Sequence, residues 1–259
     1  ERPIVAASDK SSRIATVQAL QERIIDHYLR RLKSEVLDGL PEKKFHQIQR
    51  PLSSLQMSKY MAEIRLAQNA GRGAMLACLQ KLLLLSSCPW SEKEAYGVTG
   101  TDEELSHCPK LDATVKILDG IREKGEKALI FVERLAVQGM LQSLIFQRYG
   151  IRANLINGKI TSGRQTIVDR FNEQAGFQVL ILSPKVGGTG LNITSANHVI
   201  HYMRPWNPAI ENQATDRVHR IGQEKEVHVY LPIATWPDDS GDSVEEVLNT
   251  LINSKMALA

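Results

Sequence analysis

The stretch "FQVLILSPKVGGTGLNITSANHVIHYM", residues 177–203, holds two runs rich in apolar residues, joined by a glycine-rich connection. The runs cover residues 177–182 and 198–203, the length of ordinary strands. Short strands of this kind, with little polar alternation, are typical of a parallel sheet that is covered on both faces. The stretch therefore predicts two strands of such a sheet.

The same pattern extends outward from this stretch in both directions. Further strands are expected at 128–132, 152–156 and 227–233, and helices at 134–148, 161–174, 208–221 and from about residue 243. Strands that alternate with amphipathic helices predict an α/β fold, with a parallel sheet and helices on both faces. Ligands of such sheets bind at the carboxyl ends of the strands, so the residues that follow each strand are candidates for a site.

The N-terminal part has a different, mostly helical character. Residues 16–37, "TVQALQERIIDHYLRRLKSEVL", place apolar residues at helical spacing, and Gly39 and Pro41 end that pattern. The other elements expected here are a strand, two helices and a loop, at 44–51, 53–69, 73–86 and 87–107. We therefore expect a helical attachment at 1–107 and the main α/β domain at 108–259.

Composition places the chain among ordinary folded proteins. Of its 259 residues, 24% are charged and 42% hydrophobic, and the net charge of +3 does not by itself indicate a nucleic-acid partner. The most apolar run, "CLQKLLLLSSCPW", contains Lys81 and is shorter than the roughly 20 residues that span a bilayer. No contact with a membrane is expected.

The three cysteines Cys78, Cys88 and Cys108 form no disulfide framework, which argues for a reducing cytosolic or nuclear compartment. His107 lies beside two of them, so a zinc site is one interpretation. Because the chain has no CxxC pair, buried or loop thiols are the favoured interpretation and no metal ligand is assigned.

The connection "PKVGGTGLNI" carries Gly187, Gly188 and Gly190 directly after a strand. Glycines let a backbone turn tightly and approach a phosphate without a Cβ in the way. A plain turn between strand and helix explains the same residues. The chain has no GxxxxGK[ST] motif, so it lacks the usual loop that cradles the phosphates of ATP.

The segment "RPWNPAIENQATDRVHRIGQ", residues 204–223, has the signals of a well-delimited helix, with Asn207 as its cap, Pro208 in its first turn and Gly222 beyond its end. At about 100° per residue, one face carries Gln213, Arg217 and Arg220, and a separate stripe carries Ile210, Ala214, Val218 and Ile221. The apolar stripe is expected to dock on the sheet. Two guanidinium groups on one face suit a polyphosphate, although a solvated surface helix also fits the pattern.

The segment "NGKITSGRQTIVDRFN" follows another strand and carries Lys159, Thr161 and Arg164. Thr161 or Ser162 is expected to cap the helix that follows. The basic and hydroxyl side chains suit the backbone of a nucleic acid, although an ordinary capped surface helix explains them as well. Trp206 is similarly open to two interpretations, core packing or contact with DNA.

Taken together, these segments resemble the second RecA-like lobe of the Swi/Snf family of helicase-like ATPases. The resemblance rests on "KALIFVE", "LINGKITSGRQTIVDRFN", "VLILSPKVGGTGLNITSANHVIHY", "PWNPAIENQATDRVHRIGQ" and "VHVYLPI", in that order, and on "YLRRLKSEVLDGLPEKK" upstream. It covers roughly residues 28–233. "QATDRVHRIGQ" with "GGTGLN" is its most specific part.

The resemblance implies one half of a motor that closes on ATP and double-stranded DNA and moves along the duplex. The first lobe, expected upstream in a longer chain, would hold ATP and Mg²⁺, so this lobe alone should not hydrolyse ATP. Arg217 and Arg220 match arginine fingers that reach the γ-phosphate. The residues matched to the nucleotide cleft are Gln213, Gly188 and Gly190, and those matched to a DNA strand are Ser183, Lys185, Thr161 and Arg164.

Three departures from the family pattern stand out. Met203, Arg204 and Pro205 precede "WNP", where an aspartate is common. "SPKVGG" replaces a more usual run of serine, threonine, lysine and alanine, and "SSCPW" replaces a histidine–proline pair.

There are two alternatives to this interpretation. One is a module that binds DNA or protein without hydrolysing ATP, and the other is an RNA helicase lobe. Protein partners in a larger complex are compatible with the family. The absence of appended tails favours a bacterial cytoplasmic, nucleoid-associated protein over a nuclear one.

Overall fold

A computed structural model describes residues 40–70, 73–160, 162–238 and 240–256, together with Ala19. The helix predicted at 16–37 and the candidate residue Thr161 lie outside these described residues. Within them, none of the helices combines the length and the apolar character needed to traverse a bilayer.

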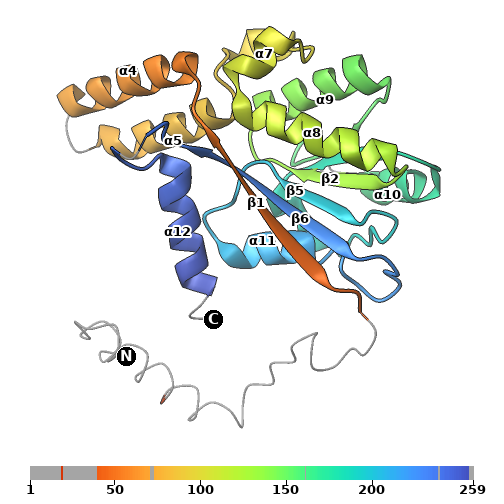
Figure 1. The fold of residues 1–259 in the computed structure, drawn as a ribbon. Helices are drawn as coiled ribbons and strands as arrows, with labels where there is room; N and C mark the ends of the chain where they lie inside the picture. The colour runs from red at the N-terminus through yellow and green to blue at the C-terminus, as the bar shows by residue number, and fades with distance from the viewer. Residues whose placement is uncertain (1–18, 20–39, 71–72, 161, 239, 257–259) are drawn as a thin grey trace.

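The centre of the fold is a parallel sheet, which within the described residues has the order β1-β6-β5-β2-β4-β3 (Figure 1). The strands are β1 (Lys43–Pro51), β2 (Lys127–Phe131), β3 (Asn154–Ile156), β4 (Gln178–Leu182), β5 (His198–His201) and β6 (Val227–Thr235). In the middle of the sheet, Ile130 of β2 pairs with Ile181 of β4 on one side and with Ile200 of β5 on the other. The predicted parallel sheet is confirmed.

Helices cover both faces of this sheet, because successive strand residues point to opposite sides. Ile130 packs in a core with α8 (Pro109–Glu123) and α9 (Leu135–Tyr149). Its neighbour Leu129 packs in a second core with α10 (Arg164–Glu173) and α11 (Pro208–Thr215). Figure 1 shows α8 and α9 on one side of the strands and α11 on the other. The predicted α/β class is confirmed.

A third core forms at the carboxyl ends of β1 and β6. It joins α4 (Ser54–Ala70), α5 (Ala74–Ser87) and α12 (Val244–Met256) through buried side chains such as Tyr60, Leu82 and Leu248. β1, which precedes the predicted boundary at 107/108, pairs with β6 from Lys43 to Pro51. The N-terminal segment thus supplies an edge strand of the sheet as well as two helices, and the boundary itself stays a prediction.

The loop predicted at 87–107 contains two short helices, α6 (Glu92–Ala95) and α7 (Asp102–His107), and that part of the prediction is wrong. Each helix begins with a capping box, in which Ser91 and Glu94, and then Thr101 and Glu104, exchange side-chain and backbone hydrogen bonds. Such a box satisfies two free N–H groups and stabilises helices too short to show periodicity.

The three cysteines are free and buried. Burial raises the pKa of the Cys88 thiol to about 11 and that of Cys108 to about 12. Both belong to the core between the sheet, α8 and α9. They pack as small apolar side chains, in line with the favoured interpretation of the sequence.

Candidate functional site at the carboxyl edge of the sheet

The glycine-rich connection after β4 forms a tight 3₁₀ turn, η2 (Pro184–Thr189), which includes Gly188. It ends at Gly190, whose φ of +61° lies in the left-handed region that favours glycine. At its start, Ser183 is buried, and its N–H donates to the carbonyl of Ile156 at 2.9 Å. Lys185 is exposed on the turn and pairs with Glu133 at 2.5 Å. The turn is therefore anchored at its base and carries a cation at its surface.

The helix that carries the arginine motif begins as the sequence predicts. The Oδ1 of Asn207 accepts from the N–H of Ala209 at 2.9 Å, and Pro208 stands in the first turn. Gly222 has a φ of +95°, as expected for a residue beyond the helix. The end differs, because α11 stops at Thr215 and not near residue 221.

Tertiary hydrogen bonds explain why the helix stops early. The carbonyl of Arg217 accepts from Ile193 N–H at 3.2 Å, a bond that helix geometry does not provide. The side-chain amide of Gln223 donates to Thr194 at 3.1 Å and to Ala196 at 2.7 Å, which holds the following chain against the loop before β5. Residues 216–222 therefore run as successive turns, and the shared face predicted for Gln213, Arg217 and Arg220 is wrong.

Arg217 points inward and is only 1% exposed. Its Nη2 donates to the carbonyl of Pro184 at 3.2 Å, and its guanidinium lies 5.4 Å from the centre of the Phe131 ring. Nε and Nη1 have no hydrogen-bond partner among the described residues. Burial, and to a lesser degree the charge of Arg220, lowers the pKa of Arg217 to about 10, so the side chain stays charged at neutral pH.

Arg220 is partly exposed, in contrast to Arg217. Its Nε donates to the Asp216 carbonyl at 3.2 Å and its Nη1 to the Gly190 carbonyl at 3.5 Å, which is a long contact. Gln213 is exposed on α11. Ile221, predicted in the apolar docking stripe, is 73% exposed, so that part of the stripe is wrong. Arg220 and Ile221 together form an open edge of the domain.

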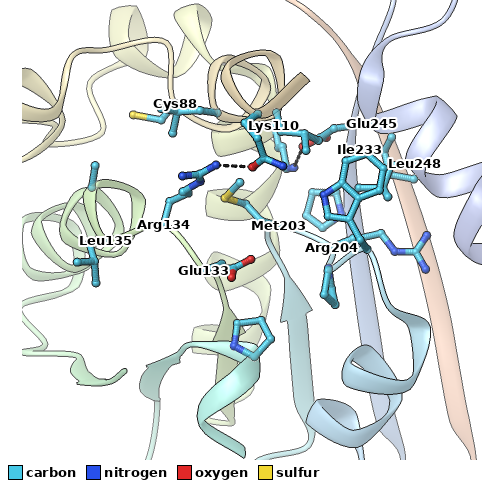
Figure 2. Close-up of a pocket in the computed structure, with 18 of the residues that line it drawn as sticks. Cys88, Lys110, Glu133, Arg134, Leu135, Met203, Arg204, Ile233, Glu245 and Leu248 are labelled. Carbon is cyan, nitrogen blue, oxygen red and sulfur yellow. Dashed lines mark hydrogen bonds and ion pairs between the residues drawn. The ribbon is translucent and has the colours of Figure 1, made fainter. Parts of the chain in front are cut away.

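A cavity of about 680 Å³ lies between the ends of the strands and the helices α5, α8 and α12. Trp206, which is 40% exposed, and Lys185 both line it. Figure 2 shows Glu133, Arg134 and Leu135 on one side of the cavity and Arg204 and Glu245 on the other. Lys110 and Glu245 form a buried ion pair of 2.5 Å in its wall.

Lys159 lies on the connection between β3 and α10, and Arg164 is the first residue of α10. Lys159 is exposed, and Arg164 Nε donates to the carbonyl of Ile160 at 2.6 Å. The N-cap residue of α10 is Gly163, with a φ of +74°, and among the described residues no side chain caps the helix. The predicted cap by Ser162 is therefore wrong, because the left-handed glycine redirects the chain before the first turn. These residues belong to a different connection from Lys185 and Trp206, which share the cavity.

Sequence reasoning missed several residues that build the site. Phe131 lies beneath Arg217, Glu133 holds Lys185, and Arg134 donates to Gln80 at 2.5 Å across the cavity. Their position in the sequence could have identified Glu133 and Arg134, since both directly follow the apolar run at 128–132 and residues after a strand are candidates for a site. A further missed feature is the ion pair of Arg204 with Glu211.

Comparison with known proteins agrees with this architecture. Residues 109–222 match the family profile described as the helicase conserved C-terminal domain. The chain is 36% identical to the Zorya protein ZorD of Escherichia coli O139:H28 (strain E24377A / ETEC), over 94% of this chain and 23% of that protein. It is 35% identical to YwqA of Bacillus subtilis (strain 168), over 92% of this chain and 26% of YwqA. The name given to YwqA describes it as a candidate ATP-dependent helicase/translocase. The chain thus spans about a quarter of the length of these relatives.

A solved structure of the Sulfolobus solfataricus SWI2/SNF2 ATPase core in complex with dsDNA is also similar. The TM-score is 0.66 at 27% identity, and the alignment covers 99% of this chain and 53% of the solved chain. The parallel sheet with helices on both faces is the RecA-like fold that the sequence resemblance implies. The chain belongs to the Swi/Snf family of helicase-like ATPases, of which it forms the C-terminal RecA-like lobe.

Proposed function

We propose that this chain is the arginine-finger lobe of an ATP-dependent translocase of double-stranded DNA. In this proposal the first RecA-like lobe of the same protein holds ATP and Mg²⁺. Arg220 reaches across to the γ-phosphate, with Arg217 behind it, and Gln213, Gly188 and Gly190 line the nucleotide cleft. The lobe alone does not hydrolyse ATP.

The observation that carries the proposal is the way in which both arginines meet the glycine-rich turn. Arg217 donates to Pro184 at the start of η2, and Arg220 donates to Gly190 at its end. Among the described residues both guanidinium groups bond to backbone carbonyls and to no carboxylate, so their charge is not neutralised. A partly exposed guanidinium group with a second, buried one beside it suits a phosphate chain.

The proposed DNA contacts lie at the same end of the sheet. Lys185 and Trp206 share the cavity, and Lys159, Arg164 and Ser183 follow or adjoin the neighbouring strands. Thr161, which lies outside the described residues, is included from the sequence resemblance alone. Lysine, arginine and hydroxyl groups position a duplex through its phosphates. The similarity to a SWI2/SNF2 core solved with dsDNA supports a duplex as the ligand in preference to RNA. A cytoplasmic, nucleoid-associated location in a bacterium is part of the same proposal.

The proposal is tested with the lobe alone and with a protein that contains both lobes. We expect no DNA-stimulated ATP turnover from the lobe alone, and turnover that depends on duplex DNA from the protein with both lobes. Arg220→Ala in the latter should remove most of the turnover. Arg122→Ala is the matched control, because Arg122 lies on α8, on the opposite face of the sheet.

Two results would contradict this proposal in different ways. Turnover by the lobe alone would mean that a first lobe is not required. DNA binding without turnover by the wild-type protein with both lobes would instead favour a binding module that does not hydrolyse ATP.

A further inference from the structure

Strand β1 forms one edge of the sheet, and its length sets it apart from the opposite edge. It pairs with β6 over 9 residues, whereas β3 at the other edge has 3. Among the described residues no strand pairs with the outer side of β1, and Figure 1 shows it as the outermost strand beside β6. Proteins usually keep such edges short, because unpaired peptide groups accept a further strand.

The pairing with β6 fixes which peptide groups of β1 point outward. The carbonyl of Glu42 accepts from the N–H of Val227 at 3.0 Å, and the N–H of Leu52 donates to the carbonyl of Thr235 at 2.9 Å. The register between these two bonds is continuous, so every even-numbered residue directs its peptide groups at β6. The odd-numbered residues of β1 therefore direct theirs away from the sheet.

The outward side of β1 is accessible. Phe45 is 56% exposed, and Gln47 and Gln49 are exposed as well. The carbonyl of Gln49 accepts from the guanidinium of Arg50 at 2.9 Å, an exposed contact that agrees with its outward direction. No hydrogen bond within the described residues uses the outward N–H groups of Phe45 and Gln47. Pro51 also stands at an outward position, where its missing N–H costs no bond to β6.

Charge selects the kind of strand that this edge accepts. The three cations of β1 are Lys43, Lys44 and Arg50, and the strand carries no carboxylate. Lys43 pairs with Asp216 at 3.2 Å and Lys44 with Glu226 at 2.6 Å. Arg50 has no carboxylate partner among the described residues. The edge therefore has an excess of positive charge, which favours an acidic ligand.

A second copy of β1 suits this edge poorly. Antiparallel pairing of two copies about Gln47 would place Lys44 of one copy opposite Arg50 of the other, and like charges in that position are destabilising. An acidic segment instead places carboxylates opposite these two cations. We propose that the outer edge of β1 binds an extended, acidic segment of a partner protein, which adds to the sheet as a further strand.

The test uses a fluorescent peptide designed on this geometry, Thr-Glu-Val-Thr-Thr-Thr-Val-Glu-Thr. Its sequence reads the same in both directions, so one glutamate lies opposite Lys44 and the other opposite Arg50 in parallel and in antiparallel pairing. A valine lies next to Phe45 in both cases. We expect saturable binding to the protein with both lobes when fluorescence anisotropy is measured at low salt.

Two altered peptides test the charge and the backbone separately. A peptide with lysine in place of both glutamates should bind about fivefold more weakly, because two like-charge pairs replace two opposite-charge pairs. A peptide with proline at its central position should bind about tenfold more weakly, because it loses a main-chain hydrogen bond to Gln47.

Gln47→Pro is the matched change in the protein. Because the N–H of Gln47 points outward, proline removes a donor to the added strand and no hydrogen bond to β6. The variant should unfold at the urea concentration of the wild type and bind the acidic peptide about tenfold more weakly. Gln47→Ala keeps the N–H and should bind like the wild type. Arg50→Glu should remove the preference for the acidic over the lysine peptide, since each then meets one like charge and one opposite charge.

Three results would overturn the inference. They are absence of saturable binding to the wild type, equal affinities of the wild type for the acidic and the lysine peptide, and wild-type affinity in Gln47→Pro. If Gln47→Pro does not fold, the peptide with the central proline decides, and equal binding of that peptide overturns the inference.

Sedimentation of the protein without peptide tests the other occupant of the edge. We expect no association of the wild type through β1. A dimer that Gln47→Pro dissociates would show that a second copy binds there, and would overturn the assignment to an acidic partner. The inference does not rest on the proposed function, since none of these measurements depends on ATP or DNA.

Discussion

Arg204 and Glu211 form a two-pronged ion pair at the base of α11, with Nε and Nη2 of the arginine donating to the two carboxylate oxygens at 2.8 and 2.7 Å. The side chains are 6% and 3% exposed. Arg204 also donates through Nη1 to Asn249 of α12. One guanidinium therefore ties the connection after β5 to two helices, at a position where the sequence departs from the common family pattern.

Removal of Glu211 should destabilise the protein strongly. Glu211→Ala leaves Arg204 buried without its carboxylate, and we expect the free energy of unfolding to fall by about 3–5 kcal/mol. The double variant Arg204→Met, Glu211→Leu should recover much of this loss, because it leaves no buried charge. Urea unfolding followed by circular dichroism measures both.

Asp112→Ala is the control for this experiment. Asp112 pairs with Lys116 at the surface, at 2.7 Å, and its loss should cost less than about 1 kcal/mol. If the free energy of unfolding of Glu211→Ala also falls by less than about 1 kcal/mol, the buried ion pair of Arg204 and Glu211 does not stabilise the protein as proposed.

His201 should make the lobe sensitive to mild acid. Its ring is fully buried, stacks on Phe131 and shares a 2.8 Å hydrogen bond with Thr215. Burial lowers the pKa of His201 to about 4, with a smaller opposing effect from Glu211 and further lowering by Arg204 and Arg217. Since the unfolded histidine has its ordinary pKa of about 6.5, the unfolded chain binds more protons between these values.

The contribution of His201 to the free energy of unfolding should therefore be fully present above pH 6.5 and should be lost as the pH falls toward 4. Between pH 7 and pH 5 we expect a loss of about 2 kcal/mol from His201. Burial also lowers the pKa values of His198 and His228, which add to the loss with the same sign. His201→Asn should flatten the dependence when urea unfolding is measured at both pH values. Equal stability of the wild type at pH 7 and pH 5 is the result that this explanation cannot accommodate.

We expect the side chain of Ile221 to contribute to the contact between the two lobes and not to the stability of this lobe. It is 73% exposed and directly follows Arg220. We expect Ile221→Ser to lower DNA-stimulated ATP turnover of the protein with both lobes, because closure would otherwise bury this side chain. Its free energy of unfolding should change by less than about 0.5 kcal/mol. Leu76→Ser, at a position 68% exposed on α5, is the control and should leave turnover unchanged. If the Ile221 and Leu76 variants hydrolyse ATP at the same rate, Ile221 does not take part in the contact between the lobes.

The features that sequence predicted well are those set by local chemistry. The cap at Asn207 and the left-handed backbone at Gly222 depend on the residue itself and its immediate neighbours. The strands followed from short apolar runs, which parallel sheets require. Even α6 and α7 carried a readable signal, since Ser91 with Glu94 and Thr101 with Glu104 have the spacing of a capping box.

The features that sequence did not predict depend on distant partners. Helical spacing predicted a shared face for Arg217 and Arg220, but a bond from Ile193 and the side chain of Gln223 end regular helix before either arginine. The same change exposes Ile221. The pairing of Glu133 with Lys185 joins residues that are separated by 52 positions, which no local pattern reports. The predicted roles of the site residues remain proposals.

The most direct test of the central claim is single-turnover hydrolysis of ATP by the protein with both lobes, with the protein and duplex DNA in saturating excess over ATP, for the wild type and Arg220→Ala. Saturation removes differences in binding, so the rate reports the chemical step. An arginine finger contributes about 10³–10⁵ in rate, and we predict that Arg220→Ala slows hydrolysis by at least about 10³ while nucleotide affinity changes only a few-fold. A rate within about threefold of the wild type would contradict the claim that this lobe supplies Arg220 to the nucleotide.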